Sequence, residues 1–265
     1  MAGKQKKPRK SLVSIADVIR AGERMSTEHG GVRRYLTPEM EISVSALPAT
    51  HQGGDFYGII VLGNGRTALF IGDVAGHDFS SSIPATEAVN FFDENQEKLL
   101  HPHLFLKDLN NYMFPLLSSV GRFITAAVCV WDVNNHVLSY ASAGHPPAVL
   151  VSDSGAAVHQ VGERMLPVGF ERDLSFKLVR KDLLPGDRML LYTDGLSSGR
   201  DSEGEEFGIE RIEELMRNSG PDTTAAVNAI KKSLEDFCCD LKEKDDCTII
   251  CAARTEQPEY STNTG

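Results

Sequence analysis

The chain has 265 residues, of which 41% are hydrophobic and 24% are charged, the composition of an ordinary globular protein. No segment approaches the roughly 20 consecutive apolar residues that span a bilayer, so we expect no integral membrane segment. The basic residues at positions 1–10 are not followed by the apolar stretch of a secretory signal. A net charge of −10 disfavours the broad basic surface of a nucleic-acid-binding protein. It suits a chain that concentrates carboxylates around a cation.

The cysteine pattern argues against a disulfide framework and against a zinc finger, because the number of cysteines is odd and no CxxC pair occurs. Cys247 and Cys251 flank the apolar run Thr248-Ile249-Ile250, which indicates small buried side chains of a strand. We therefore expect reduced thiols and a cytoplasmic location. The five cysteines are Cys129, Cys238, Cys239, Cys247 and Cys251.

The first 36 residues are expected to lie outside the main domain. Residues 1–10 are typical of a solvated basic tail, and residues 11–24 carry apolar side chains at the spacing of a short amphipathic helix. One domain is expected over 37–254, followed by a tail at 255–265. Because residues 1–36 are too short for a sensor domain, a regulatory input would come from an activating partner protein or from homodimerisation.

From residue 40 onwards, apolar side chains alternate with polar ones, which is the period of a half-buried strand. Strand patterns separated by short turns, with helical patterns between groups of strands, predict antiparallel sheets covered by helices. No GxGxxG or GxxxxGK[ST] motif follows a strand, so a Rossmann or P-loop nucleotide site is not expected. In chain order the expected strands are 40–46, 56–62, 66–73, 123–131, 137–143, 148–151, 175–179, 188–192 and 247–252. Helices are expected over 82–100, 104–120 with an interruption near Pro115, 207–217 and 223–242.

Acidic residues recur where these apolar strands end. A carboxylate at the edge of a buried strand is costly unless it is paired or bound to a metal ion. Each acid taken alone can also be a turn or capping residue, and the repetition of the pattern favours a shared function. The residues are Asp55, Asp73, Asp194 and the pair Asp245-Asp246.

The first hairpin makes this hypothesis more specific. If residues 63–65 form a three-residue loop, Leu62 pairs with Arg66. Asp55 then lies directly opposite Asp73, with the two Cβ atoms about 4.5–5.5 Å apart. Two like charges at that spacing repel each other, and a cation between them removes the repulsion. A two-residue turn would instead place the two aspartates on opposite faces.

The type of ligand indicates which cation would bind. Aspartate oxygens without a cluster of His and Cys select Mg²⁺ or Mn²⁺ over zinc. Two such ions roughly 3.5–4 Å apart can activate a water molecule and stabilise the oxygens of an in-line phosphoryl transfer. The residue types therefore indicate a metal-dependent phosphoesterase.

Five motifs, in order over about residues 40–254, resemble the sporulation stage II protein E type of the PPM (type 2C-like) Ser/Thr protein phosphatases. This group includes RsbU-like bacterial regulators of sigma factors. The resemblance implies an α+β fold, an αββα sandwich of two antiparallel sheets flanked by helices, with the metal site at one edge. The motifs are Gly53-Gly54-Asp55-Phe56-Tyr57, Ile71-Gly72-Asp73-Val74-Ala75-Gly76-His77, Ala143-Gly144-His145-Pro146-Pro147, Leu184-Pro185-Gly186-Asp187 with Tyr192-Thr193-Asp194-Gly195, and Asp245-Asp246-Cys247-Thr248.

The resemblance also implies roles for individual residues. Asp55 and Asp73 would bridge two Mn²⁺ or Mg²⁺ ions and serve catalysis through a metal-activated water. The Val74 carbonyl would be a further ligand. Asp194 and Asp245 would complete the shell of one ion, and Asp245 is preferred to its neighbour because the first acid of the pair fills that place in the family.

The activity implied by the resemblance is that of a protein phosphatase. It would hydrolyse phosphoserine or phosphothreonine on an anti-sigma-factor antagonist in a bacterial partner-switching pathway. Two alternatives stay open, a catalytically silent binding module for such a regulator and a small-molecule phosphoesterase. Retention of all four metal-position aspartates argues against the silent module, since a binding module has no need of carboxylates that repel each other.

The chain departs from the family pattern at Asp78, where a small residue is usual. Asp78 would cap the following helix or lie near the metal ions. His77 and His145 are candidate acids for the leaving alkoxide, although ordering of its glycine-rich loop is the simpler role for His145. No arginine matches a phosphate clamp, so phosphate binding would fall mainly to the metal ions.

Overall fold

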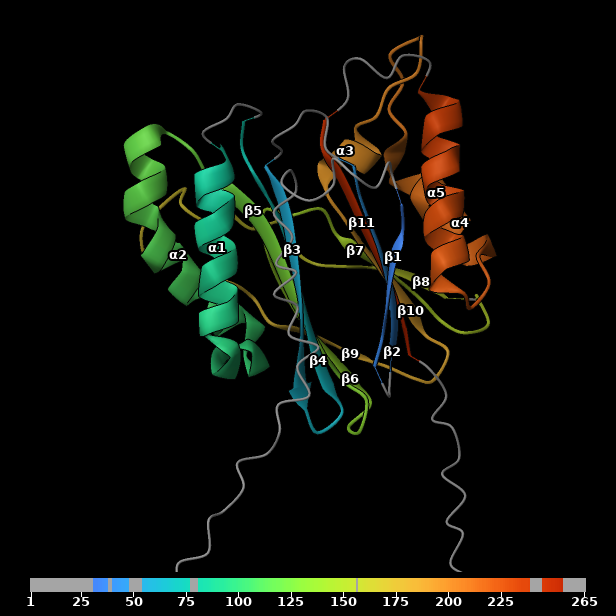
Figure 1. Cartoon of the computed structure of the whole chain (residues 1–265), viewed down its shortest axis with the longest axis horizontal. Coiled ribbons are helices and arrows are strands. Elements are labelled where there is room, and N and C mark those ends of the chain that lie inside the picture. Colours follow the sequence, from blue (N-terminus) through green and yellow to red (C-terminus); the bar gives the residue numbers. More distant parts are fainter. Residues whose placement is uncertain are drawn as a thin grey trace, which may run out of the picture.

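The computed structural model describes residues 31–37, 40–47, 54–76, 81–155, 157–238 and 245–254. Two antiparallel sheets lie face to face, with helices on both outer sides (Figure 1). The α+β, αββα sandwich expected from the sequence is confirmed. The helix expected over 11–24, and both His77 and Asp78, lie outside the described residues.

In the described part of the chain, the first sheet has five strands in the order β3-β4-β5-β6-β9. Helices α1 and α2 cover its outer face (Figure 1), where Phe70 stacks on Phe92 and meets Phe105 edge-on. The strands are β3 (Asp55–Gly63), β4 (Arg66–Val74), β5 (Ile124–Asp132), β6 (Val137–Ala143) and β9 (Val179–Asp182). The helices are α1 (Ser82–Glu94), the 3₁₀-helix η2 (Gln96–Leu100) and α2 (Pro102–Val120).

The second sheet has six described strands in the order β1-β2-β11-β10-β7-β8. Helices α4 and α5 cover its outer face, and the single turn α3 follows the end of β10 (Figure 1). The strands are β1 (Arg33–Leu36), β2 (Met40–Leu47), β7 (Ala148–Val151), β8 (Val158–Val161), β10 (Arg188–Tyr192) and β11 (Cys247–Arg254). The helices are α3 (Asp194–Ser197), α4 (Gly208–Asn218) and α5 (Thr223–Phe237).

The main core lies between the two sheets. Trp131 and Tyr140 of the first sheet pack there against Ile42 and Ile250 of the second, and all four side chains are buried. Because strand side chains alternate between faces, the same strands send other apolar residues outward against the helices. The apolar layers on both faces explain why β5 and β11 are almost continuously apolar.

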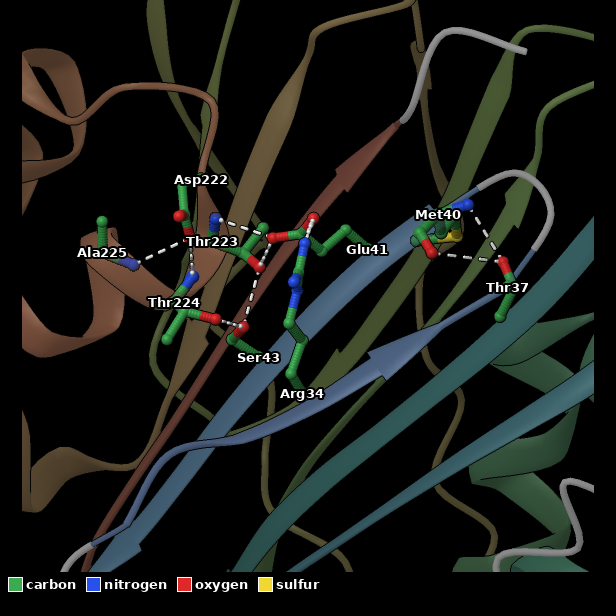
Figure 2. Close-up of polar contacts among 9 residues, drawn as sticks. All are labelled: Arg34, Thr37, Met40, Glu41, Ser43, Asp222, Thr223, Thr224 and Ala225. Atoms are coloured by element: carbon green, nitrogen blue, oxygen red, sulfur yellow. Dashed lines mark hydrogen bonds and ion pairs between the residues drawn. The ribbon is translucent and has the colours of Figure 1, made fainter. Parts of the chain in front are cut away.

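A polar network attaches α5 to the second sheet (Figure 2). Glu41 of β2 accepts hydrogen bonds from Arg34 of β1 and from the backbone and hydroxyl of Thr223. Burial acts to raise the pKa of Glu41, and these donors outweigh it and lower the pKa. Ser43 adds hydroxyl contacts of 2.8 Å to Thr223 and Thr224. The first turn of α5 is thereby held to the edge of the sheet that carries β1.

Several element boundaries differ from those expected. Helix α2 continues through Pro115, because the proline lies on the exposed face while Phe105, Leu109 and Met113 bury the opposite face against the sheet. That burial outweighs the roughly 3 kcal/mol cost of an internal proline. The helix expected over 82–100 is divided at Asn95 into α1 and η2.

Three short strands at sheet edges, β1, β8 and β9, were the elements least visible in the sequence. The strand expected at 175–179 was misplaced and is β9, which runs from Val179 to Asp182. The edge strands β1 and β8 were missed because each has only four residues and little apolar alternation. Strand β1 lies on the N-terminal side of the boundary expected at residue 37. In the part of the chain that the structure describes, no helix has the length and apolar character needed to cross a membrane.

Candidate metal centre

Asp55 and Asp73 face each other across the β3–β4 pair, as the sequence predicted. The turn that produces this register differs from the one expected. Gly63, not Leu62, pairs with Arg66, so the turn has only two residues, both with positive φ. An irregularity between Val61 and Gly63 shifts the register by one residue. This bulge restores the pairing that a two-residue turn would otherwise have destroyed.

The Asp55 carboxylate is held by Thr248 of the opposite sheet and by Thr193, which directly follows β10. Its Oδ2 atom accepts hydrogen bonds from the hydroxyls of Thr193 and Thr248, each over 2.7 Å. Its Oδ1 atom is buried and has no hydrogen-bond donor among the described residues. A buried carboxylate oxygen without a donor is costly, and a cation would satisfy it. The two hydroxyls therefore orient the carboxylate so that one oxygen is available for a ligand.

Gly54 makes room for two more oxygens beside Asp55. A Cβ atom at Gly54 would lie 2.7 Å from Asp73 Oδ1 and 2.7 Å from the Val74 carbonyl oxygen. The Gly54 carbonyl in turn accepts the Val74 N–H over 3.2 Å. Any larger residue would therefore push both oxygens away from the start of β3.

Asp194 and Asp245 reach the same edge from the second sheet. Asp194 is the first residue of α3. A Cβ atom at the next residue, Gly195, would lie 2.1 Å from the Asp246 carbonyl oxygen and 3.4 Å from the Asp245 Cβ. Glycine is needed there because α3 approaches the segment before β11 so closely.

The pKa values show that these carboxylates act on one another. Burial raises the pKa of Asp73 to about 7, and the nearby charges of Asp194, Asp245 and Asp246 contribute to the shift. Burial and then the Asp73 charge raise the pKa of Asp55 well above its ordinary value. The pKa of Asp194 is raised by burial and by Asp245. An opposite charge at this edge would relieve all of these effects.

The atoms that could coordinate a cation at this edge are all carboxylate or carbonyl oxygens, which are the ligands that hard divalent cations prefer. In the described ranges, however, no three His, Cys, Asp or Glu side chains are placed closely enough to hold a metal ion together. The fit therefore rests on the unpartnered Asp55 oxygen and on the oxygens beside Gly54. The residues that could hold the ions are Asp55, Asp73, Val74, Asp194 and Asp245.

Two threonines and one aspartate at this edge were not assigned a role from the sequence. Thr193 and Thr248 hold Asp55, and Asp246 accepts the Gly54 N–H. Asp246 is buried, whereas Asp245 is exposed. The sequence did point to these three residues, because all of them belong to the motifs Thr193-Asp194-Gly195 and Asp245-to-Thr248.

His145 lies next to the same edge and is neutral. Its Nδ1 atom is 3.1 Å from the hydroxyl of Thr125, which pairs with Asp73 on the neighbouring strand. Burial lowers the pKa of His145 to about 3. A cavity of about 750 Å³ begins at His145 and Tyr192 and is also lined by Arg164, Ser198 and Ile209. His145 therefore contacts the strand partner of Asp73 and also lines this cavity.

Arg122 holds both ends of the segment that leaves β4. Its Nη1 atom donates to the Ala75 carbonyl over 3.0 Å and to the Ser81 hydroxyl over 2.6 Å. Ser81 donates in turn to the Gly76 carbonyl over 2.5 Å. These bonds fix the backbone directly after Val74.

Comparison with known proteins finds relatives both in sequence and in fold. Phosphoserine phosphatase RsbU of Bacillus subtilis is 26% identical over 218 residues, which are 81% of this chain and 63% of RsbU. The chain thus matches less than two thirds of that relative. The SiaA-PP2C domain of Pseudomonas aeruginosa superposes with a TM-score of 0.72 at 21% identity, covering 81% of this chain and 86% of the domain.

The catalytic domain of the serine/threonine protein phosphatase PstP, solved with two manganese ions, superposes with a TM-score of 0.60. Its identity to this chain is 13%, and the match covers 82% of this chain and 99% of that domain. The sequence model of the stage II sporulation protein E family matches residues 63–255, a range that contains Asp73, Val74, Asp194 and Asp245. With a match of that extent on this fold, the chain belongs to the stage II sporulation protein E (SpoIIE) family.

Proposed function

We propose that the chain is a metal-dependent protein phosphatase that hydrolyses phosphoserine or phosphothreonine and uses two Mn²⁺ or Mg²⁺ ions. The observation that carries the proposal is the pair Asp55 and Asp73, face to face, with one buried Asp55 oxygen left without a described donor. Such a pair destabilises the protein unless a cation binds between the carboxylates. Two ions would fit the relationship to PstP, whose structure holds two manganese ions.

The roles of the chain's own residues follow from their contacts. Asp55 and Asp73 would bridge the ions, with Val74, Asp194 and Asp245 as further ligands. When bound, the ions supply Lewis acidity and a water nucleophile at neutral pH. Thr193 and Thr248 fix the Asp55 carboxylate, and Arg122 fixes the backbone after Val74.

His145 is less suited to donate a proton in its present environment. A group whose pKa is about 3 is neutral at physiological pH and holds no extra proton to give. Its contact with Thr125 supports the simpler role of ordering the loop at Gly144.

The substrate class is proposed from the family relationship and from the cavity. RsbU is named a phosphoserine phosphatase. A cavity of about 750 Å³ beside the carboxylate edge has room for the residues that flank a phosphoserine. We infer that the substrate is an anti-sigma-factor antagonist in a partner-switching pathway, and that a partner protein or a second copy of the chain regulates the enzyme.

A cytoplasmic location belongs to the same proposal. Cys129 and Cys251 are buried free thiols. Burial raises the pKa of Cys251 to about 12, so this thiol is unreactive. Reduced, unpaired cysteines are typical of a cytosolic protein.

The test is turnover of three substrates with Mn²⁺, with Mg²⁺ and with excess EDTA. The substrates are a phosphoserine protein of the antagonist type, a phosphothreonine peptide and p-nitrophenyl phosphate. The proposal expects metal-dependent release of phosphate from the phosphoprotein and loss of activity in EDTA. Binding without turnover would support the silent binding module, and turnover of p-nitrophenyl phosphate alone would support the small-molecule phosphoesterase.

A further inference from the structure

Asp246 makes a contact that the set of metal ligands does not use. Its Oδ2 atom accepts the backbone N–H of Gly54 over 2.6 Å. Gly54 precedes β3 in one sheet and Asp246 precedes β11 in the other, so the bond joins the two sheets at the carboxylate edge. Asp246 is only 6% exposed, and Gly54 is also buried. A short hydrogen bond from an amide to a buried carboxylate is among the stronger ones in a protein.

We propose that Asp246 is a positioning residue that fixes the backbone of Gly54 and, through it, the oxygens of Asp73 and Val74. The inference rests on the proposed metal site. It assigns Asp246 a role that differs from that of its neighbour Asp245, which would be a ligand.

The position of Gly54 determines the position of both oxygens. Its carbonyl accepts the Val74 N–H over 3.2 Å, so the two backbones move together. A Cβ atom at Gly54 would meet Asp73 Oδ1 and the Val74 carbonyl oxygen, each at 2.7 Å. A small shift of this backbone would therefore change the space available to both oxygens.

The bonds between the sheets at this edge run in both directions. Asp55 of the first sheet accepts from Thr193 and Thr248 of the second. Asp246 of the second accepts from Gly54 of the first. Asp55 and Gly54 are adjacent, so three hydrogen bonds to residues on the side of the second sheet fix two consecutive residues at the start of β3.

The presence of a fifth carboxylate at this edge needs such an explanation. The charge of Asp246 adds to the repulsion felt by Asp73 and Asp55. Burying a fifth negative charge beside four other carboxylates destabilises the folded protein, and a merely capping role would not explain that cost. The bond to Gly54 gives the site a fixed backbone in return, and groups that orient metal ligands are as necessary as the ligands themselves.

The test uses Asp246→Asn and Asp246→Ala in the full chain, with two measurements. The first is hydrogen exchange of the Gly54 amide in metal-free protein. The second is Mn²⁺ affinity by calorimetry. The asparagine oxygen can still accept the Gly54 N–H, so Asp246→Asn should keep Gly54 exchange within about threefold of the natural chain. Its Mn²⁺ binding should weaken less than that of Asp246→Ala, because only the charge is lost and the hydrogen bond remains. Asp246→Ala should speed Gly54 exchange by about tenfold or more and weaken Mn²⁺ binding by about 10–100-fold.

Asp187 provides a matched control. It is also a buried aspartate that accepts backbone N–H groups, from Leu184 and Asp153, but it precedes β10, whereas Asp194 follows that strand. Asp187→Ala should lower thermal stability and leave the Mn²⁺ affinity and the Gly54 exchange of the folded protein unchanged. If Asp246→Ala does not fold, Asp246→Glu takes its place, because the longer side chain keeps the charge and misplaces the acceptor.

Two results would overturn the inference. If Asp246→Asn weakens Mn²⁺ binding as severely as Asp245→Asn, then Asp246 is itself a ligand. If neither Asp246→Ala nor Asp246→Glu changes Gly54 exchange, the bond does not hold that backbone. Neither measurement needs a substrate, so an absence of phosphatase activity would refute the proposed function and still leave the role of Asp246 decided.

Discussion

Thr248, on a strand of the second sheet, donates its hydroxyl hydrogen to Asp55, on a strand of the first sheet, over 2.7 Å. Thr193 donates to the same oxygen, and its own hydroxyl oxygen accepts the Thr248 N–H over 2.8 Å. The three side chains thus form a closed unit across the sandwich. The unit leaves the other Asp55 oxygen buried and without a described donor, which is the arrangement expected of a metal ligand held in advance.

Thr248→Val should weaken Mn²⁺ binding by about 10–100-fold, the usual effect of removing a group that orients a metal ligand. The valine has nearly the same shape, so the change removes the donor without opening a cavity. Mn²⁺ affinity is measured by calorimetry. Thr67→Val is the matched control, because Thr67 is equally buried but lies at the opposite end of β4 from Asp73. Equal affinities for all three proteins would show that the hydroxyl does not orient Asp55.

Asp73→Asn should lower turnover by roughly two orders of magnitude or more, because it removes a proposed bridging ligand. In metal-free protein at pH 8 the same change should raise the melting temperature by a few degrees. The reason is that Asp73 is ionised above its pKa of about 7 and is then repelled by Asp194 and Asp245. Thermal melts in EDTA and in Mn²⁺, with turnover measured beside them, test both parts.

A turn-capping aspartate would behave in the opposite way. Its replacement removes a local hydrogen bond, costs about 1 kcal/mol of stability and hardly affects chemistry. Turnover close to that of the natural chain, together with a lower melting temperature in EDTA, would therefore mean that Asp73 is structural.

Much of the architecture could be predicted from the sequence, because the central strands carry strong signals. The apolar alternation from Met40 and the turn residues after β3 identified antiparallel sheets covered by helices, and the resemblance to the PPM phosphatases implied the two-sheet sandwich. The short edge strands lacked these signals. Val179–Asp182 is mostly charged, and its strand conformation depends on pairing with β6, which a local pattern does not show.

The candidate site was predicted in part, and the limit was again tertiary contact. The pairing of Asp55 with Asp73 came from counting along the hairpin, and it holds only because a bulge compensates for a shorter turn. The partner of Asp246 is Gly54, 192 positions away in the sequence. No spacing rule connects residues that far apart, so the role of Asp246 became visible only in three dimensions.

Asp73 should make the metal-free protein progressively less stable as the pH rises from about 4 to about 7. The pKa of Asp73 is about 7 in the folded protein, against an ordinary value of 3.8 in the unfolded chain. Between these values Asp73 is protonated to a greater extent in the folded state than in the unfolded state, so its contribution to the free energy of unfolding decreases with rising pH. Asp55, whose pKa is also raised, acts in the same direction.

Urea unfolding in EDTA at pH 5, 6, 7 and 8 measures this slope. Asp73→Asn should show a shallower decrease than the natural chain over the same range, since asparagine does not titrate. The comparison isolates Asp73 from the other titrating groups. Parallel curves for the two proteins would contradict the raised pKa.

Arg122→Ala should destabilise the protein by about 1–3 kcal/mol and weaken Mn²⁺ binding. Arg122 donates to the Ala75 carbonyl and to the Ser81 hydroxyl, so its removal leaves two acceptors unsatisfied and frees the backbone after Val74. Arg122→Lys should recover part of the loss, because an ammonium group keeps the charge and lacks the planar fork of donors.

Arg66→Ala is the matched control. Arg66 pairs with Asp132 over 2.7 Å at the hairpin end of β4, the end opposite Val74. Its loss should cost less than about 1 kcal/mol of stability and leave Mn²⁺ affinity unchanged. Urea unfolding and calorimetry on the four proteins separate the two effects, and an Arg122→Ala protein with unchanged Mn²⁺ affinity would show that the arginine stabilises the fold without shaping the metal centre.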